Sequence, residues 1–284
     1  MKNILMGEMT VKEVREYLTN DKKTIIVPYG VVEQHGYHLP LDTDIRNSEI
    51  MGRKIAEELG CLVAPTLNYC FSGGMLEGTI NVRPNTFATL MCEIVESLAL
   101  QGFENIIIIP GHGGSESLVN LKESLRVAKW LNRALDKCLL MFIPLWDFSP
   151  TWLNLFKNRD FHAGNAETSL MMHLSPEVVR KDIVMDSPEI SEMMRNDPDS
   201  FQVRSLFTGM KHEIPTTTQN PEIRVGVMGY PESASVETGR KMFEEILENS
   251  VRAIREAVSG AEEARKTGKM IVDDKLEKMK ILSL

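Results

Sequence analysis

The sequence has few cysteines and no excess of positive charge. Its 284 residues include four cysteines, and none of them forms a Cys-x-x-Cys pair. This spacing argues against a cysteine zinc site and favours buried, reduced thiols of an intracellular protein. The net charge of −8 argues against nucleic acid or an anionic membrane surface as the main partner, because both require basic patches.

Long apolar runs are also missing. No stretch approaches the roughly 20 apolar residues that a membrane span requires. The first residues, MKNILMGEMTVKEVREYL, contain neither a long apolar core nor a small-residue cleavage site. We therefore expect a cytoplasmic protein. The composition that is present, 43% apolar and 25% charged, is typical of a soluble globular chain.

Strand-like and helix-like segments alternate through the first half of the chain. Continuous apolar runs predict strands at 24–30, 61–67, 105–111 and 138–146, and helical spacing predicts helices at 44–60, 86–102 and 116–135. Continuous rather than alternating strands are typical of a parallel sheet that helices cover on both faces. We predict a three-layer α/β/α fold with a mostly parallel sheet.

The second half has a looser pattern. Helices are predicted at 164–174 and 237–258, whereas residues 186–224 are polar and have no clear period. We interpret 186–224 as an insertion that serves as a lid or an oligomer contact, and the charged segment after about residue 260 as a peripheral tail. With no internal repeat and no linker, residues 1–284 are predicted to form a single domain.

The segment VEQHGYHLPLDTD, residues 32–44, places titratable side chains directly after a buried strand. Glu33 and His35 are two residues apart, so in an extended segment they point to the same side. Asp44 follows nine residues after His35, at a predicted helix start. Simpler interpretations remain open: Asp44 as a helix N-cap, Glu33 as a surface residue and His35 as a hydrogen-bonded core histidine.

Two further motifs carry titratable residues. His112 lies in PGHGGSES after the 105–111 strand, where the glycines allow close approach of a substrate. An anion-binding loop is the alternative there, but the lysine of a P-loop is missing. His162 and Glu167 lie in FHAGNAETS. Their alternatives are a surface-loop histidine and a glutamate that favours the helix dipole.

These residue types point to metal chemistry. Carboxylate and imidazole ligands without thiolate suit Zn, Mn or Fe(II). Three to five such ligands, with one bridging carboxylate, support a binuclear centre that activates water and polarises a carbonyl group. Because ligands bind at the carboxyl ends of strands in such sheets, the EQH, GHGG and WDFSP segments are expected to converge. Neither a GxSxG motif nor a Cys/His nucleophile signature is present, which disfavours covalent catalysis.

Taken together, PYGVVEQHGYHLPLDTD, GHGG and HAGNAETS resemble the creatininase (creatinine amidohydrolase) family. The resemblance implies a layered α/β fold, a homo-oligomer that is commonly a hexamer, and a centre with two divalent metals, Zn first and Mn or Fe(II) as alternatives. The implied ligands are Glu33, His35, Asp44, His112 and Glu167, with Asp44 bridging. The resemblance further implies that His162 is the proton shuttle.

Substrate contacts follow from the same resemblance. Residues 71–87 resemble the substrate loop of the family, which points to Ser72, with Gly113 and Gly114, as substrate-binding residues. In creatininase proper the histidine of the second motif is followed by Tyr and a metal-binding Glu, whereas this chain has Gly113 and Gly114. This departure argues against creatinine itself as the substrate, and shifts the fifth-ligand role to Glu167 or leaves one metal loosely held.

The sequence thus supports three functional hypotheses. The first is a hydrolase that uses metal-activated water to open a small cyclic amide or to cleave a related non-peptide C–N bond. The second is a C–C hydrolase that opens a cyclic diketone from inositol (polyol) catabolism, such as a dehydro-inosose. The third is a family member that binds a metabolite without turnover.

Overall fold

A four-stranded parallel sheet forms the centre of the protein in a computed structural model, which describes residues 3–20 and 23–271. The strand order is β2-β1-β3-β4, and every neighbouring pair is parallel. The strands are β1 (Thr24–Tyr29), β2 (Leu62–Val63), β3 (Asn105–Pro110) and β4 (Leu139–Phe142).

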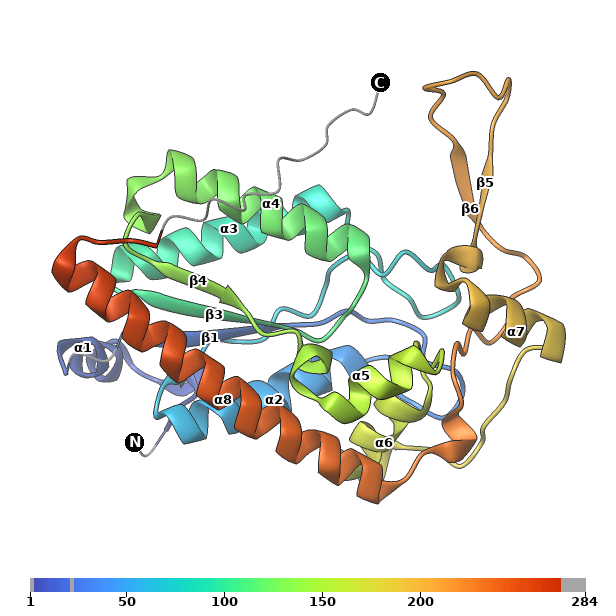
Figure 1. Ribbon diagram of the computed structural model, residues 1–284, viewed down its shortest axis with the longest axis horizontal. Helices are drawn as coiled ribbons and strands as arrows, with labels where there is room; N and C mark the ends of the chain where they lie inside the picture. Colours follow the sequence, from blue (N-terminus) through green and yellow to red (C-terminus); the bar gives the residue numbers. More distant parts are fainter. Residues whose placement is uncertain (1–2, 21–22, 272–284) are drawn as a thin grey trace.

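Helices cover both faces of this sheet (Figure 1). The first core contains side chains of α1, α3 and α4, and the second contains side chains of α2, α5, α6 and α8. The helices are α1 (Val11–Thr19), α2 (Thr43–Leu59), α3 (Pro84–Gln101), α4 (Ser115–Leu131), α5 (Pro150–Lys157), α6 (Asn165–Leu174), α7 (Pro188–Asn196) and α8 (Val236–Thr267). The predicted three-layer α/β/α fold is confirmed.

Alternation along β3 explains why its isoleucine run is buried on both sides. Ile106 and Ile108 belong to the core with α3 and α4, whereas Ile107 and Ile109 belong to the core with α2 and α8. All four are fully buried. Successive side chains of a strand point to opposite faces, so a central parallel strand requires apolar residues at every position.

Several element boundaries differ from the sequence prediction; the strand predicted at 138–146, for example, ends at Phe142. The strand predicted at 61–67 is paired regularly only at Leu62–Val63, because Pro65 has no N–H group for a continued ladder. The last helix continues to Thr267, nine residues beyond its predicted end. The guanidinium of Arg265 donates to the Glu104 carbonyl oxygen and the Asn105 side chain, so this part of the predicted peripheral tail packs against the sheet.

The predicted polar insertion contains ordered elements. It holds α7 and the antiparallel hairpin of β5 (Gln202–Ser205) and β6 (Thr216–Gln219). We call residues 202–219 the arm, which projects away from the helix–sheet body next to α7 (Figure 1). The single-domain assignment of residues 1–284 stays a prediction. No helix among residues 3–20 and 23–271 is both long and apolar enough to cross a membrane.

Candidate metal centre

The titratable residues of all three motifs meet at the carboxyl ends of β1 and β3. Glu33 and His35 follow β1, and His112 follows β3. Asp44 lies in the first turn of α2, and Glu167 lies in the first turn of α6. Parallel strands bring their carboxyl ends to one edge of the sheet, which explains why residues more than a hundred positions apart become neighbours.

Two glycines allow α2 to approach the strand ends. A Cβ atom at Gly111 would lie 1.9 Å from the carbonyl oxygen of Asp44, and one at Gly30 would lie 2.5 Å from the backbone nitrogen of Ile45. Only glycine fits at such contacts. The N-cap of α2 is Asp42 rather than Asp44. The N-cap interpretation of Asp44 is therefore wrong, and its side chain is directed at two histidines.

The first ligand cluster consists of Glu33, Asp44 and His112. Nδ1 of His112 lies 3.1 Å from Oε2 of Glu33 and 3.1 Å from Oδ2 of Asp44. The three groups offer ligand atoms that all lie within 4.8 Å of one another. One carboxylate from each of two segments and one imidazole nitrogen therefore surround a space suited to a metal ion.

The second cluster uses the other oxygen of Asp44. Nε2 of His35 lies 3.2 Å from Oδ1 of Asp44 and 3.6 Å from Oε2 of Glu167. Again the three ligand atoms lie within 4.8 Å of one another. Asp44 thus faces one cluster with Oδ2 and the other with Oδ1, which is the arrangement that a bridging carboxylate requires.

The charge balance of the site fits bound cations. Three carboxylates, of Glu33, Asp44 and Glu167, lie in a largely buried space where their charged neighbours are histidines. Burial alone would lower the pKa of His35, but Asp44 and the other carboxylates raise it to about 10. Burial raises the pKa of Glu167 to about 7, with Asp44 adding to that shift. A divalent ion would offset this excess of negative charge.

His35 is held in the tautomer that a metal ligand needs. Its Nδ1 lies 3.1 Å from the Glu33 carbonyl oxygen, so Nδ1–H donates there and Nε2 faces the two carboxylates. Within the described residues, Nε2 of His35 and Nε2 of His112 have no hydrogen-bond partner. Nε2 of His35 is a buried nitrogen that faces carboxylate oxygens, and its ring is fixed by the hydrogen bond of Nδ1. It therefore fits a zinc or manganese ligand.

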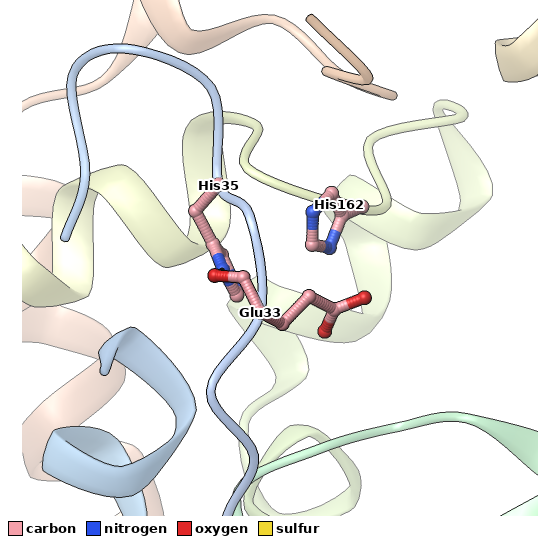
Figure 2. Close-up of side chains that lie close together, drawn as sticks. All are labelled: Glu33, His35 and His162. Atoms are coloured by element: carbon pink, nitrogen blue, oxygen red, sulfur yellow. Dashed lines mark hydrogen bonds between the residues drawn. The ribbon is translucent and has the colours of Figure 1, made fainter. Parts of the chain in front are cut away.

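His162 lies beside the two clusters, and its pKa is shifted in the opposite direction to that of His35. Figure 2 shows His162 on a loop next to Glu33 and the His35 ring. The centroids of the two imidazole rings are 4.3 Å apart. Nε2 of His162 lies 2.7 Å from the Gln34 carbonyl oxygen, which requires Nε2 to donate a proton and leaves the lone pair on Nδ1. Burial and the nearby charge of His35 lower its pKa to about 4.

Several supporting residues did not emerge from the sequence. Asp160 is buried and accepts hydrogen bonds from the N–H groups of Asn165 and Ala166, which fixes the start of α6. His38, within the 32–44 segment, is fully buried with Nε2 2.9 Å from the Thr168 hydroxyl. No sequence pattern points to these two residues, because the Thr168 partner of His38 is distant in the chain and Asp160 lies outside the three motifs.

A cleft of about 640 Å³ opens over the two clusters. The predicted substrate contacts Ser72, Gly113 and Gly114 all line it. Ser72 is also a partner of a ligand, since its hydroxyl donates to Oε1 of Glu33 over 2.6 Å. Of the WDFSP segment, Trp146 reaches the cleft wall. The arm and its flanks contribute further lining residues, namely Asp199, Phe201, Gln219 and Ile223.

Known proteins with similar sequences are named as hydrolases or peptidases. Creatinine amidohydrolase from Pseudomonas putida is 25% identical over 90% of this chain and 97% of its own length. The mycofactocin precursor peptide peptidase of Mycobacterium ulcerans is 29% identical over 81% of this chain and 84% of its own. The 3-dehydro-scyllo-inosose hydrolase of Thermotoga maritima is 26% identical over 63% of this chain and 58% of its own.

Solved structures show the same fold. A manganese form of creatininase superposes with a TM-score of 0.70 at 23% identity, over 89% of this chain and 98% of that chain. A mutant creatininase of Zn-Zn type gives a TM-score of 0.70 at 24% identity, over 90% and 98%. The family model described as creatininase, creatinine amidohydrolase, matches residues 7–254. This chain therefore belongs to the creatininase family of hydrolases.

Proposed function

We propose that this hydrolase holds two divalent metal ions and cleaves a C–N bond of a small amide, with a cyclic amide as the leading substrate class. The observation that carries the proposal is the division of Asp44 between two ligand clusters. Glu33 and His112 complete one cluster, and His35 and Glu167 complete the other. Zinc is the leading candidate and manganese the alternative, because one related creatininase structure is a Zn-Zn form and another is a manganese form.

The proposed reaction divides the work between the metals and the chain. Divalent ions in such a site act as Lewis acids toward a carbonyl oxygen and lower the pKa of water. Ser72 holds Glu33 in its ligand orientation by the 2.6 Å hydrogen bond. Gly113 and Gly114 line the cleft at the N-terminus of α4, where backbone N–H groups are available to a developing oxyanion.

His162 is proposed to move the proton. Its pKa of about 4 keeps the ring neutral near pH 7, and the proton on Nε2 is committed to the Gln34 carbonyl oxygen. Nδ1 is then free to take a proton from the attacking water and to pass it to the leaving nitrogen. General acid–base catalysis of this kind contributes about 10²- to 10⁴-fold to a rate.

The comparisons favour C–N over C–C cleavage. The relatives that match more than 80% of this chain are named an amidohydrolase and a peptidase, and both names describe C–N hydrolysis. Gly113 and Gly114 remain an argument against creatinine itself, since the metal-binding Glu of creatininase proper is replaced there. In its place, Glu167 supplies the fifth carboxylate or imidazole ligand.

C–C hydrolysis of a cyclic diketone is the second candidate. Its support is the similarity to the 3-dehydro-scyllo-inosose hydrolase over 63% of this chain. The absence of side chains at Gly113 and Gly114 leaves room for a hydroxylated ring at the cleft. The hypothesis of a binder without turnover is set aside, because the relatives that match this chain are named as an amidohydrolase, a peptidase and a hydrolase.

Metal content of single variants tests the two-metal proposal. Asp44→Asn removes the negative charge that the two clusters share and replaces one of the two ligand oxygens by an amide nitrogen, so it is expected to abolish retention of both ions. Glu33→Gln and Glu167→Gln each damage one cluster, so each is expected to leave one ion per chain after dialysis. Asp42→Asn, two residues from Asp44 and outside both clusters, serves as the control with full metal content. An Asp44→Asn protein that retains both ions and full activity would refute the assignment.

A substrate screen then decides whether the enzyme cleaves a C–N or a C–C bond. Protein loaded separately with Zn, Mn and Fe(II) is assayed against creatinine, other lactams, formamides, short peptides and cyclic 1,3-diketones, with Asp44→Asn as the blank. Turnover of a lactam or formamide supports the proposal, whereas turnover of diketones alone replaces it with C–C hydrolysis. Hexameric assembly and a cytoplasmic location stay predictions.

A further inference from the structure

One side of α4 lines the cleft over its first two turns. Ser115, Leu118, Val119 and Lys122 all line it, and positions three or four residues apart lie on the same side of a helix. At 1.5 Å of rise per residue, Ser115 and Lys122 are about 10 Å apart along the helix axis. Because α4 begins directly after His112 and Gly114, this wall of the cleft runs from the first ligand cluster to Lys122.

The cleft is large, and its surface along this wall is apolar. Clefts of about 300–1,000 Å³ hold drug-sized ligands, and this one measures about 640 Å³. Leu118 and Val119 supply apolar surface on α4, and Val119 is 62% exposed. Trp146 lies across from the start of α4, since a Cβ atom at Gly113 would lie 3.6 Å from its indole ring. A substrate that lies along α4 therefore fits best when it has an apolar stretch next to its reacting group.

Lys122 is the one lysine or arginine among the described residues that line the cleft. Its Nζ lies 5.5 Å from the centroid of the Phe142 ring, and no carboxylate oxygen within residues 3–20 and 23–271 lies within 4.0 Å of it. Burial raises the pKa of Asp147, and the nearby charge of Lys122 partly offsets that rise. A lysine ammonium has three N–H donors, so Lys122 has donors available to a ligand.

The other charges of the cleft favour Lys122 as the place for an anionic group. Four carboxylates line the cleft, those of Glu33, Glu116, Glu167 and Asp199. Glu33 and Glu167 belong to the ligand clusters, where bound metal ions would offset their charge. Glu116 and Asp199 are exposed acids outside both clusters, so they repel a ligand carboxylate. Repulsion at these positions and attraction at Lys122 together select the orientation of an anionic substrate.

We propose that the substrate is an amide with a free carboxylate, joined to the scissile group by an apolar chain of about 10 Å, and that Lys122 binds this carboxylate. The inference rests on the proposed two-metal centre, because that centre holds the scissile carbonyl at one end of the α4 wall. Lys122 then determines specificity through binding and takes no part in the chemical step. A ring as small as creatinine would not extend to Lys122, which agrees with the argument that Gly113 and Gly114 give against creatinine.

Hydroxamates with a carboxylate tail test the inference by binding, without turnover. The hydroxamate group chelates divalent metals, and a straight alkyl chain carries the carboxylate. Each acid is compared with its own methyl ester by calorimetry on the zinc-loaded protein. With a chain of about 10 Å, the acid is expected to bind about fivefold more tightly than the ester, as an ion pair that is partly exposed to solvent allows. With a chain of about half that length, the acid and the ester are expected to bind equally, because the carboxylate stops short of Lys122.

Variants of α4 assign the preference for the acid to Lys122. Lys122→Met is expected to bind the long acid and its ester equally, with unchanged affinity for the ester, whereas Lys122→Arg is expected to keep the preference. The matched control is Arg126→Met, which removes a cation of the next turn that pairs with Glu123 outside the cleft, and which is expected to bind as wild type does.

The outcomes separate this inference from the proposed function. Equal binding of the long acid and its ester by wild type would overturn the inference and leave the metal centre standing. A preference for the acid that survives in Lys122→Met, or that Arg126→Met abolishes equally, would also overturn it. A zinc-loaded protein that binds neither compound would refute the two-metal centre, and this inference with it.

Discussion

Ser72 offers a sharp test of how the centre is held together. Its hydroxyl donates to Oε1 of Glu33 over 2.6 Å and the residue is buried. Oε2 of the same carboxylate faces Nδ1 of His112. Ser72 therefore fixes one oxygen of Glu33 while the other is presented to the first cluster. Replacing Ser72 by Ala removes this constraint and leaves a buried carboxylate oxygen without its donor.

The size of the effect follows from the charge of the acceptor. A hydrogen bond to a charged group contributes about 1.5–3 kcal/mol. At about 1.4 kcal/mol per factor of ten, this corresponds to a loss of about 10- to 150-fold in affinity for one metal ion. Partners of metal ligands elsewhere contribute about 10- to 100-fold, which is consistent. The cluster of His35, Asp44 and Glu167 does not contain Glu33, so its ion is expected to bind with nearly unchanged affinity.

Competition with a chromophoric chelator measures the two affinities separately. Ser117→Ala is the matched control, because Ser117 is also buried but donates its hydroxyl to the Phe71 carbonyl oxygen instead of a ligand. A Ser72→Ala protein with two wild-type affinities would refute the reasoning. Equal weakening of both ions would also refute it, since that result would place Ser72 in a general structural role.

Four further predictions concern residues of the site. His162→Ala is expected to keep both metals and to lower kcat by about 10²- to 10⁴-fold, measured by metal analysis and steady-state kinetics. Metal affinity is expected to rise with pH, because the carboxylates raise the pKa of His35 to about 10 in the metal-free protein and the ion must displace that proton. The raised pKa of His35 also stabilises the fold of the metal-free protein below pH 6.5, and this stability is lost as the pH rises towards 10. Chelator competition across pH checks the prediction on metal affinity, and thermal unfolding across pH checks the prediction on stability. Gly111→Ala is expected to weaken the binding of both ions at least tenfold, since its Cβ would lie 1.9 Å from the Asp44 carbonyl oxygen. Isothermal calorimetry measures both affinities, and wild-type values would contradict this prediction.

The sequence by itself determined the layers of the fold and the residue types that gather at the candidate centre. Continuous apolar runs such as Ile106–Ile109 can be satisfied only where both faces of a strand are covered, so they specify a buried parallel sheet. Polar residues directly after those runs must then gather at one edge. Local signals were equally direct: Gly60 ends α2 in a left-handed conformation, and Thr10 and Glu13 form the capping box that opens α1.

Only the tertiary structure decided how the ligands are divided and what supports them. The assignment of the two Asp44 oxygens to different clusters depends on the close approach of α2 to Gly30 and Gly111, a contact between distant segments that no local pattern encodes. The hydrogen bond of Ser72 to Glu33 and the projection of the arm have the same origin. Periodicity reports which side of an element is buried, whereas the partner that a polar side chain meets depends on how whole elements pack.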